Sequence, residues 1–374
     1  MLPYGRQNVT DADIEAVTAA LRSDWLTTGP KVDLFENDLA RIAGAPCVSV
    51  SNGTAALHTA YAAAGIGAGD EVITTPMTFW ATAGTATTLG ATVVFADVEE
   101  DTANLDPYAV EAAITPRTRA IAAVDYAGHP AEYDELRKIA DSADATLIAD
   151  AAHAIGSTYR GRPVGTLADL TTFSFFPTKN LTTAEGGAVA STDPALLERA
   201  RIFRTVGLVR DPAVLRRTDE GPWFYEVQEL GLNYRLPDVL CALGSSQLRR
   251  LGDFKARRVA LSARYDEFLA DVPGLRLPVT RDYVDPMRHL YPVRVQGGRR
   301  REVFERMRAA GIGVQVNYIP VYWHPLYEDL GYQRGMCPNA EAFYAEQLSL
   351  PLFYDLTDAD QDRVIETLRT ILES

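Results

Sequence analysis

Lysine is scarce in this sequence. Only Lys31, Lys138, Lys179 and Lys255 occur among its 374 residues, and arginine supplies the rest of the positive charge. With so few lysines, one that lies inside a distinctive motif is a sharper signal of chemistry than usual.

Cysteine, long apolar runs and net positive charge are also lacking. Cys47, Cys241 and Cys337 are odd in number and far apart, which argues against a disulfide framework and fits a reducing cytoplasm. No apolar run approaches the length of a membrane-spanning helix, and the first residues lack the apolar core of a signal peptide. A net charge of −14 argues against a nucleic-acid backbone as the main partner, although a local arginine cluster can still bind a small anion. We expect a cytoplasmic protein without membrane or nucleic-acid partners, and we predict no metal site.

Short apolar runs alternate with helix-like segments through the first half of the chain. Such alternation predicts an α/β fold with a mostly parallel sheet covered by helices on both faces. The candidate strands are Cys47–Ser51, Glu71–Thr74, Thr92–Phe95, Thr118–Val124, Thr146–Asp150, Leu170–Phe175 and Gly187–Ser191. The helix-like segments include Ala55–Ala64, Trp80–Leu89 and Asp134–Ser142.

The pattern changes in the last third of the chain. A long helical, arginine-rich stretch is predicted over Arg235–Leu269, followed by a strand at His289–Val295, a helix at Arg301–Ala310, a strand at Val314–Tyr318 and a last helix at Thr357–Leu372. We predict a large α/β domain over residues 1–250, with an N-terminal arm at 1–12, and a smaller C-terminal α/β domain over residues 251–374.

Lys179 lies in a short polar loop between two predicted strands. The glycines at 186 and 187 permit a close approach of the backbone to a bulky group. Burial and a nearby positive charge can keep such a lysine partly neutral, as imine chemistry with an aldehyde cofactor requires. Taken alone, this loop is explained more simply by a solvated surface lysine.

Asp150 ends a predicted parallel strand, where α/β folds bind ligands. A buried carboxylate there can pair with a protonated pyridine nitrogen, or it can merely cap the following turn. His153, three residues on, either contacts the same ligand or packs in the core.

Two further segments suit a phosphorylated aromatic ligand. Gly53 and Thr54 open a helix after a strand, where backbone N–H groups bind phosphate, although Asn-Gly is also a common turn. Phe79 or Trp80 can stack on a pyridine ring or serve as a core aromatic. The stretch Glu220–Gly244 has two aromatics close together and then GLNYR before a helix, and its exposed aromatic loop is expected to cover a site or another chain.

Five segments occur in a fixed order: SNGTAAL from Ser51, TFWAT from Thr78, DAAHA from Asp150, SFFPTKNLTTAEGG from Ser174 and GLNYR from Gly231. Their order and spacing resemble the DegT-type family of sugar aminotransferases over nearly the whole chain. The resemblance implies a fold-type I aminotransferase that uses pyridoxal 5'-phosphate (PLP), with a seven-stranded sheet in the large domain. It also implies a homodimer whose active sites are shared between the subunits.

The resemblance assigns the catalytic residues. Lys179 is expected to form the Schiff base with PLP, Asp150 to pair with the pyridine nitrogen, and His153 to lie beside the phenolic oxygen. A related subgroup that carries histidine in place of the lysine dehydrates its substrate, so Lys179 places this chain on the aminotransferase side.

The resemblance also assigns the residues that hold the cofactor. Gly53, Thr54 and Ser174 match the phosphate cradle, and Phe79 matches the stacking aromatic. Asn233 matches a residue that reaches the phosphate of the partner subunit, which would make a monomer inactive.

One branch of the family fits more closely. YGRQ near the start, LRSDWLTTGP, EGPWFYE, YIPVYWHPLY and the stretch Ser349–Ile365 resemble aminotransferases of the pseudaminic acid pathway. That branch moves an amino group from L-glutamate to the 4-keto group of UDP-2-acetamido-2,6-dideoxy-β-L-arabino-hexos-4-ulose. Arg6, Arg235, Tyr318 and His324 are candidate contacts for glutamate or the UDP-sugar.

One position departs from the family pattern, and other readings stay open. Phe176 stands where the family usually has histidine, which leaves the acceptor less certain than the cofactor. Alternative acceptors are another nucleotide keto sugar or a keto-cyclitol in antibiotic or cell-surface glycan synthesis. A non-catalytic PLP-binding regulatory protein is a further alternative. A nicotinamide-dependent enzyme would need a G-x-G-x-x-G turn, which SNGTAAL does not supply.

Overall fold

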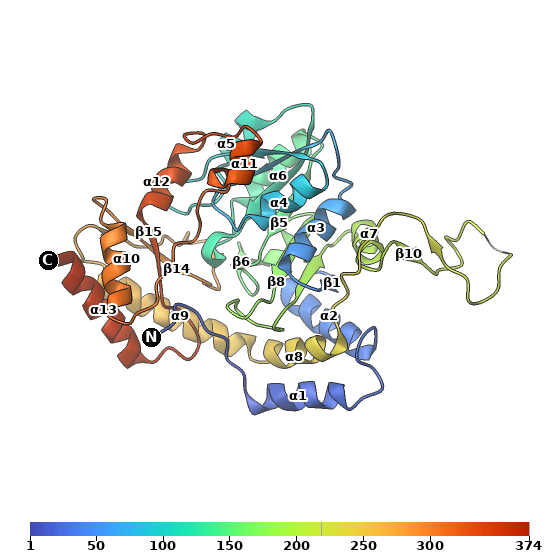
Figure 1. Cartoon of the computed structure of the whole chain (residues 1–374), viewed down its shortest axis with the longest axis horizontal. Helices are drawn as coiled ribbons and strands as arrows, with labels where there is room; N and C mark the ends of the chain where they lie inside the picture. The colour runs from blue at the N-terminus through green and yellow to red at the C-terminus, as the bar shows by residue number, and fades with distance from the viewer. Residues whose placement is uncertain (218, 374) are drawn as a thin grey trace.

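The computed structural model describes residues 1–217 and 219–373, and its main element is a seven-stranded sheet (Figure 1). The strand order is β1-β9-β8-β5-β4-β2-β3, and only β9 runs antiparallel to its neighbours. The strands are β1 (Cys47–Val50), β2 (Glu71–Thr74), β3 (Thr92–Phe95), β4 (Thr118–Val124), β5 (Thr146–Asp150), β8 (Leu170–Ser174) and β9 (Gly187–Ala190). The prediction of an α/β fold with a mostly parallel seven-stranded sheet is confirmed.

Alternate residues of the central strands face two separate cores. Ile121 and Ala123 of β4 pack in one core, and Ala120 and Ala122 pack in the other. This alternation follows from the period of two along a strand. The first core includes side chains of α2 (Pro30–Ala43), α5 (Pro107–Ala113), α6 (Tyr133–Ser142) and α8 (Asp238–Leu248), and the second includes α3 (Gly53–Ala63), α4 (Ala81–Thr88) and α7 (Pro194–Arg204). Helices therefore cover both faces of the sheet.

The C-terminal third contains a second, smaller sheet. β12 (Leu275–Arg276), β14 (Tyr291–Val295) and β15 (Gln347–Leu350) form three antiparallel strands. They pack with α9 (Leu251–Leu269), α10 (Arg300–Ala309) and α13 (Asp358–Glu373) around a third core. The helices α11 (Pro325–Asp329) and α12 (Pro338–Glu346) instead contribute Tyr327 and Phe343 to a core of the large sheet. The proposed domain boundary at 250/251 stays a prediction.

Two elements differ from the sequence prediction. The long helix predicted over Arg235–Leu269 is two helices, α8 and α9, because Arg250 leaves helical geometry and its guanidinium bonds Asp13 near the N-terminus. The predicted strand at Val314–Tyr318 is reduced to a single bridge between Gln315 and Ser349. The ladder stops there because Asn317 N donates to the side chain of Gln347, at 2.8 Å, rather than to a backbone carbonyl.

The remaining elements are short or peripheral. The N-terminal helix is α1 (Asp11–Leu21), with a capping box between Thr10 and Asp13. A small antiparallel sheet combines β13 (Val284–Asp285), β6 (Thr158–Tyr159) and β7 (Arg162–Pro163). Among the described residues, no helix is both long and apolar enough to span a membrane.

The predicted aromatic loop projects from the body of the molecule (Figure 1). It carries a two-stranded sheet of β10 (Leu208–Val209) and β11 (Glu226–Val227). The side chains of Trp223 and Leu230 are 75% and 92% exposed. We call residues 206–217 and 219–232 the projecting arm.

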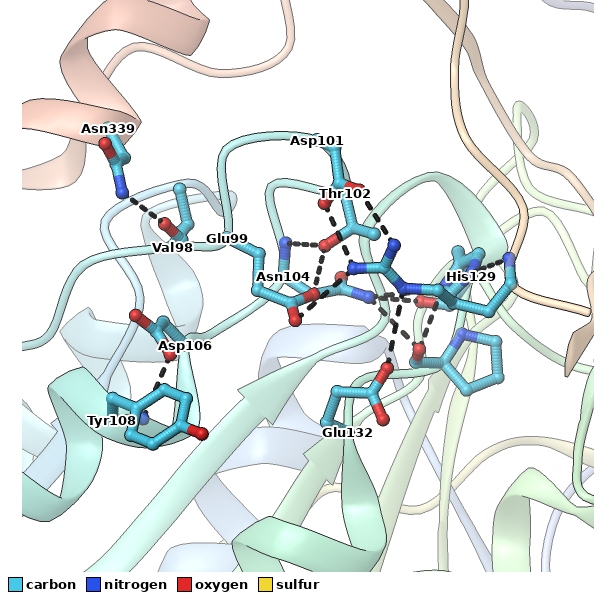
Figure 2. Close-up of polar contacts among 12 residues, drawn as sticks. Val98, Glu99, Asp101, Thr102, Asn104, Asp106, Tyr108, His129, Glu132 and Asn339 are labelled. Carbon is cyan, nitrogen blue, oxygen red and sulfur yellow. Dashed lines mark hydrogen bonds and ion pairs between the residues drawn. The ribbon is translucent and has the colours of Figure 1, made fainter. Parts of the chain in front are cut away.

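A polar network joins the C-terminal third to the edge of the large sheet (Figure 2). The guanidinium of Arg281 pairs with Asp101 at 2.8 Å and faces Glu99 and Glu132 at 3.5 and 3.8 Å. His129 lies in the same network, where its Nε2 accepts from the backbone N–H of Arg281 at 3.2 Å. Asn104 also belongs to it, because its Nδ2 donates to His129 O at 3.0 Å. We call Glu99, Asp101, Asn104, His129, Glu132 and Arg281 together the Arg281 network.

Candidate active site

A cavity of about 540 Å³ opens at the carboxyl ends of β5 and β8. Ligands of α/β folds bind at this edge of the sheet. The cavity brings together eight of the residues singled out from the sequence: Gly53, Thr54, Phe79, Asp150, His153, Ser174, Lys179 and Tyr318.

Asp150 is the last residue of β5 and is buried at the base of the cavity. Its carboxylate accepts a hydrogen bond from Thr82 Oγ1 at 2.6 Å and one from the backbone N–H of Ala152 at 3.2 Å. Burial raises the pKa of Asp150, whereas these two hydrogen bonds and the nearby Lys179 favour the charged form. A hydrogen-bonded carboxylate in this place can pair with a cationic ring nitrogen.

Lys179 lies in the loop that follows β8, where its backbone N–H donates to Phe176 O at 2.8 Å. Burial lowers the pKa of Lys179 to about 8, because a low-dielectric environment disfavours the ammonium form, and Asp150 partly opposes this shift. A substantial fraction of the side chain is therefore neutral amine near pH 8. None of the hydrogen bonds among the described residues involves its Nζ.

His153, Tyr318 and His289 form a stack of rings on one wall. His153 Nε2 lies 3.1 Å from the Tyr318 hydroxyl, and the two rings are nearly parallel at 21°. On the other side the ring of His289 lies 4.4 Å from that of His153. Burial holds the pKa of both imidazoles well below the usual range, and the charge of Lys179 adds to this shift. Both histidines are therefore neutral at physiological pH.

The start of α3 forms a second wall of the cavity. Asn52 caps the helix by accepting from Ala55 N at 2.7 Å, and Gly53 and Thr54 occupy the first turn. A Cβ on Gly53 would lie 2.8 Å from the Cβ and Oγ of Ser174, so only glycine allows the helix start to approach β8 this closely. Unpaired N–H groups of a first turn and the helix dipole favour an anion at this point.

Aromatic side chains surround the mouth of the cavity. Phe79 and Phe176 are 51% and 46% exposed, and Tyr4 of the N-terminal arm lies among the lining residues. Phe79 also faces Tyr318, with ring centroids 6.3 Å apart. Exposed aromatics beside a cavity are typical of a surface that receives a ligand.

Four predicted residues do not line this cavity. Arg6 lies behind it, in a narrow recess that also contacts Lys179. Arg235 lines a separate cavity of about 450 Å³ beside Trp25. Asn233 is exposed and bridges to Thr205, and His324 lies at the start of α11.

The structure adds residues that the sequence did not single out. Thr82, Asn180, His289 and Tyr4 all contact the predicted site residues or line the cavity. Thr82 and Asn180 belong to the TFWAT and SFFPTKN segments, so these motifs could have identified them from the sequence. His289 reaches the site through tertiary packing, with its N–H donating to Ala127 O at 2.9 Å, and carries no local signal.

Comparison with known proteins identifies the family. The model of the DegT/DnrJ/EryC1/StrS aminotransferase family matches residues 7–369. The chain belongs to this family. It is therefore a sugar aminotransferase, and the family depends on PLP.

The relatives are similar over their full length. The spore coat polysaccharide biosynthesis protein SpsC of Bacillus subtilis is 40% identical, with 100% of this chain and 97% of that protein covered. The UDP-4-amino-4,6-dideoxy-N-acetyl-β-L-altrosamine transaminase of Campylobacter jejuni (serotype O:23/36) is 39% identical, with 100% and 98% covered.

Solved structures agree with this assignment. The PLP form of the Streptococcus pneumoniae sugar aminotransferase Spr1654 superposes with a TM-score of 0.93 at 32% identity, covering 100% of this chain and 98% of that one. Helicobacter pylori PseC, an aminotransferase involved in the biosynthesis of pseudoaminic acid, gives a TM-score of 0.93 at 32% identity, covering 100% and 99%. The fold is thus that of a fold-type I PLP-dependent aminotransferase.

The residues of the cavity fit this cofactor. Asp150 offers a hydrogen-bonded carboxylate for a pyridine nitrogen, and the close approach of Gly53 to Ser174 leaves a helix start open for a phosphate. His153 Nδ1 is buried and has no hydrogen-bond partner within the described part of the chain, so it is free for a polar group of a ligand.

Proposed function

We propose that the chain transfers the amino group of L-glutamate to the 4-keto group of a UDP-linked 4-keto-6-deoxy amino sugar, UDP-2-acetamido-2,6-dideoxy-β-L-arabino-hexos-4-ulose. The observation that carries the proposal is the cavity that joins Lys179, Asp150 and the start of α3 in a sugar aminotransferase. The acceptor is supported by the Campylobacter jejuni relative, whose name specifies the corresponding amino sugar, and by full-length coverage of both chains.

Lys179 would hold the cofactor covalently and, once the amino donor has displaced it, would move the proton in both half-reactions. Bound PLP supplies an electron sink that stabilises negative charge on the carbon next to the transferred nitrogen. With its pKa lowered to about 8, Lys179 can act as base in one half-reaction and as acid in the other. Asp150, held by Thr82 and by Ala152 N, keeps a negative charge opposite the ring nitrogen.

The other predicted cofactor residues hold and orient PLP. Gly53, Thr54 and Ser174 hold its phosphate at the start of α3, where the helix dipole favours an anion. Phe79 would stack on the ring of PLP from the mouth of the cavity, and His153 would bind its phenolic oxygen.

A homodimer completes the site in this proposal. Asn233 is exposed and does not line the cavity of its own chain, as expected for a residue that serves the partner subunit. The projecting arm has large apolar side chains that are exposed, which supports a protein contact there. Arg6, Arg235, Tyr318 and His324 remain proposed contacts for glutamate or the UDP-sugar, and Tyr318 is the one that lines the cavity.

We also propose a cytoplasmic location. Cys47, Cys241 and Cys337 are buried free thiols, which supports a reducing compartment.

The absorption spectrum of the PLP-loaded protein tests the proposal. L-Glutamate should abolish the band of lysine-bound PLP as 2-oxoglutarate is released, and the UDP-4-keto sugar should restore it. A band that disappears with glutamate but does not return with the sugar would support L-glutamate as the donor and refute the proposed acceptor. Protein that shows no band with PLP would refute the roles of Lys179 and Asp150.

A second acceptor is another nucleotide-linked keto sugar, supported by the similarity to SpsC of Bacillus subtilis. Phe176 places an apolar ring at the mouth of the cavity, where a different sugar would be selected. A panel of UDP- and dTDP-linked 3-keto and 4-keto sugars, added after glutamate in the same assay, distinguishes these acceptors.

A further inference from the structure

The two ring nitrogens of His153 have different surroundings. Nε2 lies 3.1 Å from the Tyr318 hydroxyl, whereas Nδ1 is buried and has no hydrogen-bond partner among the described residues. Burial, with Lys179 nearby, holds the pKa of His153 well below its usual range, so the neutral ring carries a single N–H. A ligand therefore meets either a donor or a lone pair at Nδ1, according to which nitrogen holds the proton.

A chain of buried polar side chains lies behind Tyr318, and a backbone amide sets its direction. The backbone N–H of Asn317 can only donate, and it bonds Oε1 of Gln347 at 2.8 Å. The side-chain amide of Gln347 is thereby oriented, and its Nε2 donates to Ser349 Oγ at 2.7 Å. The Ser349 hydroxyl in turn donates to Oδ1 of Asn317 at 3.0 Å. Gln347 and Ser349 of β15 are fully buried, so bulk water does not reach these bonds.

The side chain of Asn317 connects this chain to Tyr318. Its Oδ1 accepts from Ser349, which leaves Nδ2 as a donor. Burial raises the pKa of Tyr318 well above its usual range, and a hydrogen bond from the Asn317 side chain acts in the opposite direction. Such a bond lowers the pKa of a phenol only where the phenol oxygen accepts it, so Asn317 donates to Tyr318. The Tyr318 proton then needs an acceptor, and among the hydrogen bonds of the described residues this acceptor is His153 Nε2.

We propose that Tyr318 and Asn317 are positioning residues that fix the tautomer of His153 with its proton on Nδ1, so that this nitrogen donates to a ligand in the cavity. The chain of donors begins in the small C-terminal sheet and ends at the wall of the cavity. This inference rests on the proposed role of His153, because it makes His153 a donor to the phenolic oxygen of PLP. A donor there stabilises negative charge on that oxygen.

Nuclear magnetic resonance reads the tautomer directly. The five histidines are labelled with nitrogen-15, and His153→Gln identifies the signals of His153. In a neutral imidazole the protonated and unprotonated nitrogens resonate far apart, and their couplings to the ring hydrogens distinguish Nδ1 from Nε2. The unaltered protein, without PLP and with it, is expected to hold the proton on Nδ1. A proton on Nε2 would overturn the proposal, and the readout needs neither turnover nor a correct sugar, so it can fail independently of the proposed function.

Two substitutions test whether the chain sets the tautomer. Tyr318→Phe keeps the ring but removes the hydroxyl, so the His153 proton should no longer be confined to Nδ1. Asn317→Asp keeps the shape of the side chain but replaces a donor with an acceptor, so the Tyr318 hydroxyl should turn to donate to the new carboxylate. The Tyr318 oxygen must then accept from His153, and the proton should move to Nε2. A residue that serves only packing would not reverse a tautomer.

The absorption band of lysine-bound PLP gives a second readout. Without a donor at the phenolic oxygen, negative charge there is less stabilised, so the bound cofactor keeps its proton to higher pH. The pH midpoint of the band should rise by about one unit in Tyr318→Phe, and by at least as much in Asn317→Asp.

One result in the variants would also overturn the proposal. A His153 proton that stays on Nδ1 in both Tyr318→Phe and Asn317→Asp would show that other contacts set the tautomer. If Asn317→Asp does not fold, the unaltered protein and Tyr318→Phe still decide the outcome.

Discussion

The Arg281 network and the Lys179 cavity differ in whether their polar side chains have hydrogen-bond or ion-pair partners. In the network, Asn104 donates from Nδ2 to the carbonyls of His129 and Pro130, and Arg281 faces three carboxylates (Figure 2). In the cavity, His153 Nδ1 and His289 Nδ1 are buried without partners among the described residues, and so is Oδ1 of Asn180, the residue after Lys179. The network uses its polar groups to join two parts of the fold, and the cavity keeps them free for a ligand.

This difference indicates that the network contributes to the stability of the fold, whereas the cavity contributes to catalysis. Buried polar groups are nearly always paired in folded proteins, so several unpaired atoms around one lysine mark a site rather than a defect. Substitutions in the cavity should therefore reduce turnover more than stability, and substitutions in the network should do the reverse.

The largest effect is expected for Lys179→Ala. Removing the amine that moves the proton should reduce transamination at least about a thousandfold, while the thermal melting temperature changes little. Steady-state turnover and melting curves measure the two effects. Lys138→Ala is the control, because Lys138 makes only a surface pair with Glu135 and should retain full activity. Comparable losses in both variants would contradict the comparison.

Asp150→Asn should have the next largest effect. It preserves the shape of the side chain but removes the charge opposite the ring nitrogen, so kcat/KM should fall about a hundredfold. Thr82→Val removes only the hydroxyl that holds Asp150 and should cost about fivefold to tenfold. Activity in Asp150→Asn equal to that of the unaltered enzyme would refute the role of the carboxylate.

His129 should make the stability of the network depend on pH. Burial, with Arg288 nearby, lowers its pKa from 6.5 to about 4, so below pH 6.5 the unfolded chain binds the proton first. Its contribution is complete above pH 6.5 and is lost as the pH falls toward 4, by about 2 kcal/mol between pH 7 and pH 5. Urea unfolding at both pH values measures it. His129→Gln should lose less stability between pH 7 and pH 5 than the unaltered protein. Equal losses in the two proteins would contradict the assignment of this pH dependence to His129.

The smallest effect is expected for Arg281→Ala. Loss of its partly buried ion pairs should lower the free energy of unfolding by about 1–2 kcal/mol and change kcat/KM less than about twofold. Arg276→Ala, which removes one exposed pair with Glu100, should have no measurable effect. A loss of PLP affinity without a loss of stability in Arg281→Ala would show that the network serves the site.

Much of the fold could be predicted from local patterns. The seven strands of the large sheet lie where short apolar runs placed them, and the capping box of Thr10 and Asp13 marks the start of α1. The helices α5, α7 and α12 were missed, although each begins with proline at its first position. Proline is favoured there because its fixed φ suits the helix and its missing N–H has no partner to lose.

The candidate site could be predicted only in part. Asp150 ends β5 and Lys179 lies in the loop after β8, so their place at one edge of the sheet follows from the topology of a parallel sheet. His289 lies 110 positions after Lys179 in the sequence. It reaches the cavity because its backbone N–H bonds to Ala127 O and because Asn180 bonds to the carbonyl of Met287, two residues before it. No local sequence pattern encodes these contacts. The lowered pKa of Lys179 likewise depends on burial that exists only in the folded chain.

The most direct test of the account is to identify the lysine that holds PLP. The protein is incubated with PLP, reduced with borohydride, digested, and the modified peptide is found by mass spectrometry. The account predicts the pyridoxyl group on Lys179 and on none of Lys31, Lys138 or Lys255. Stoichiometric modification of one of those three lysines, with Lys179 unmodified, would contradict it.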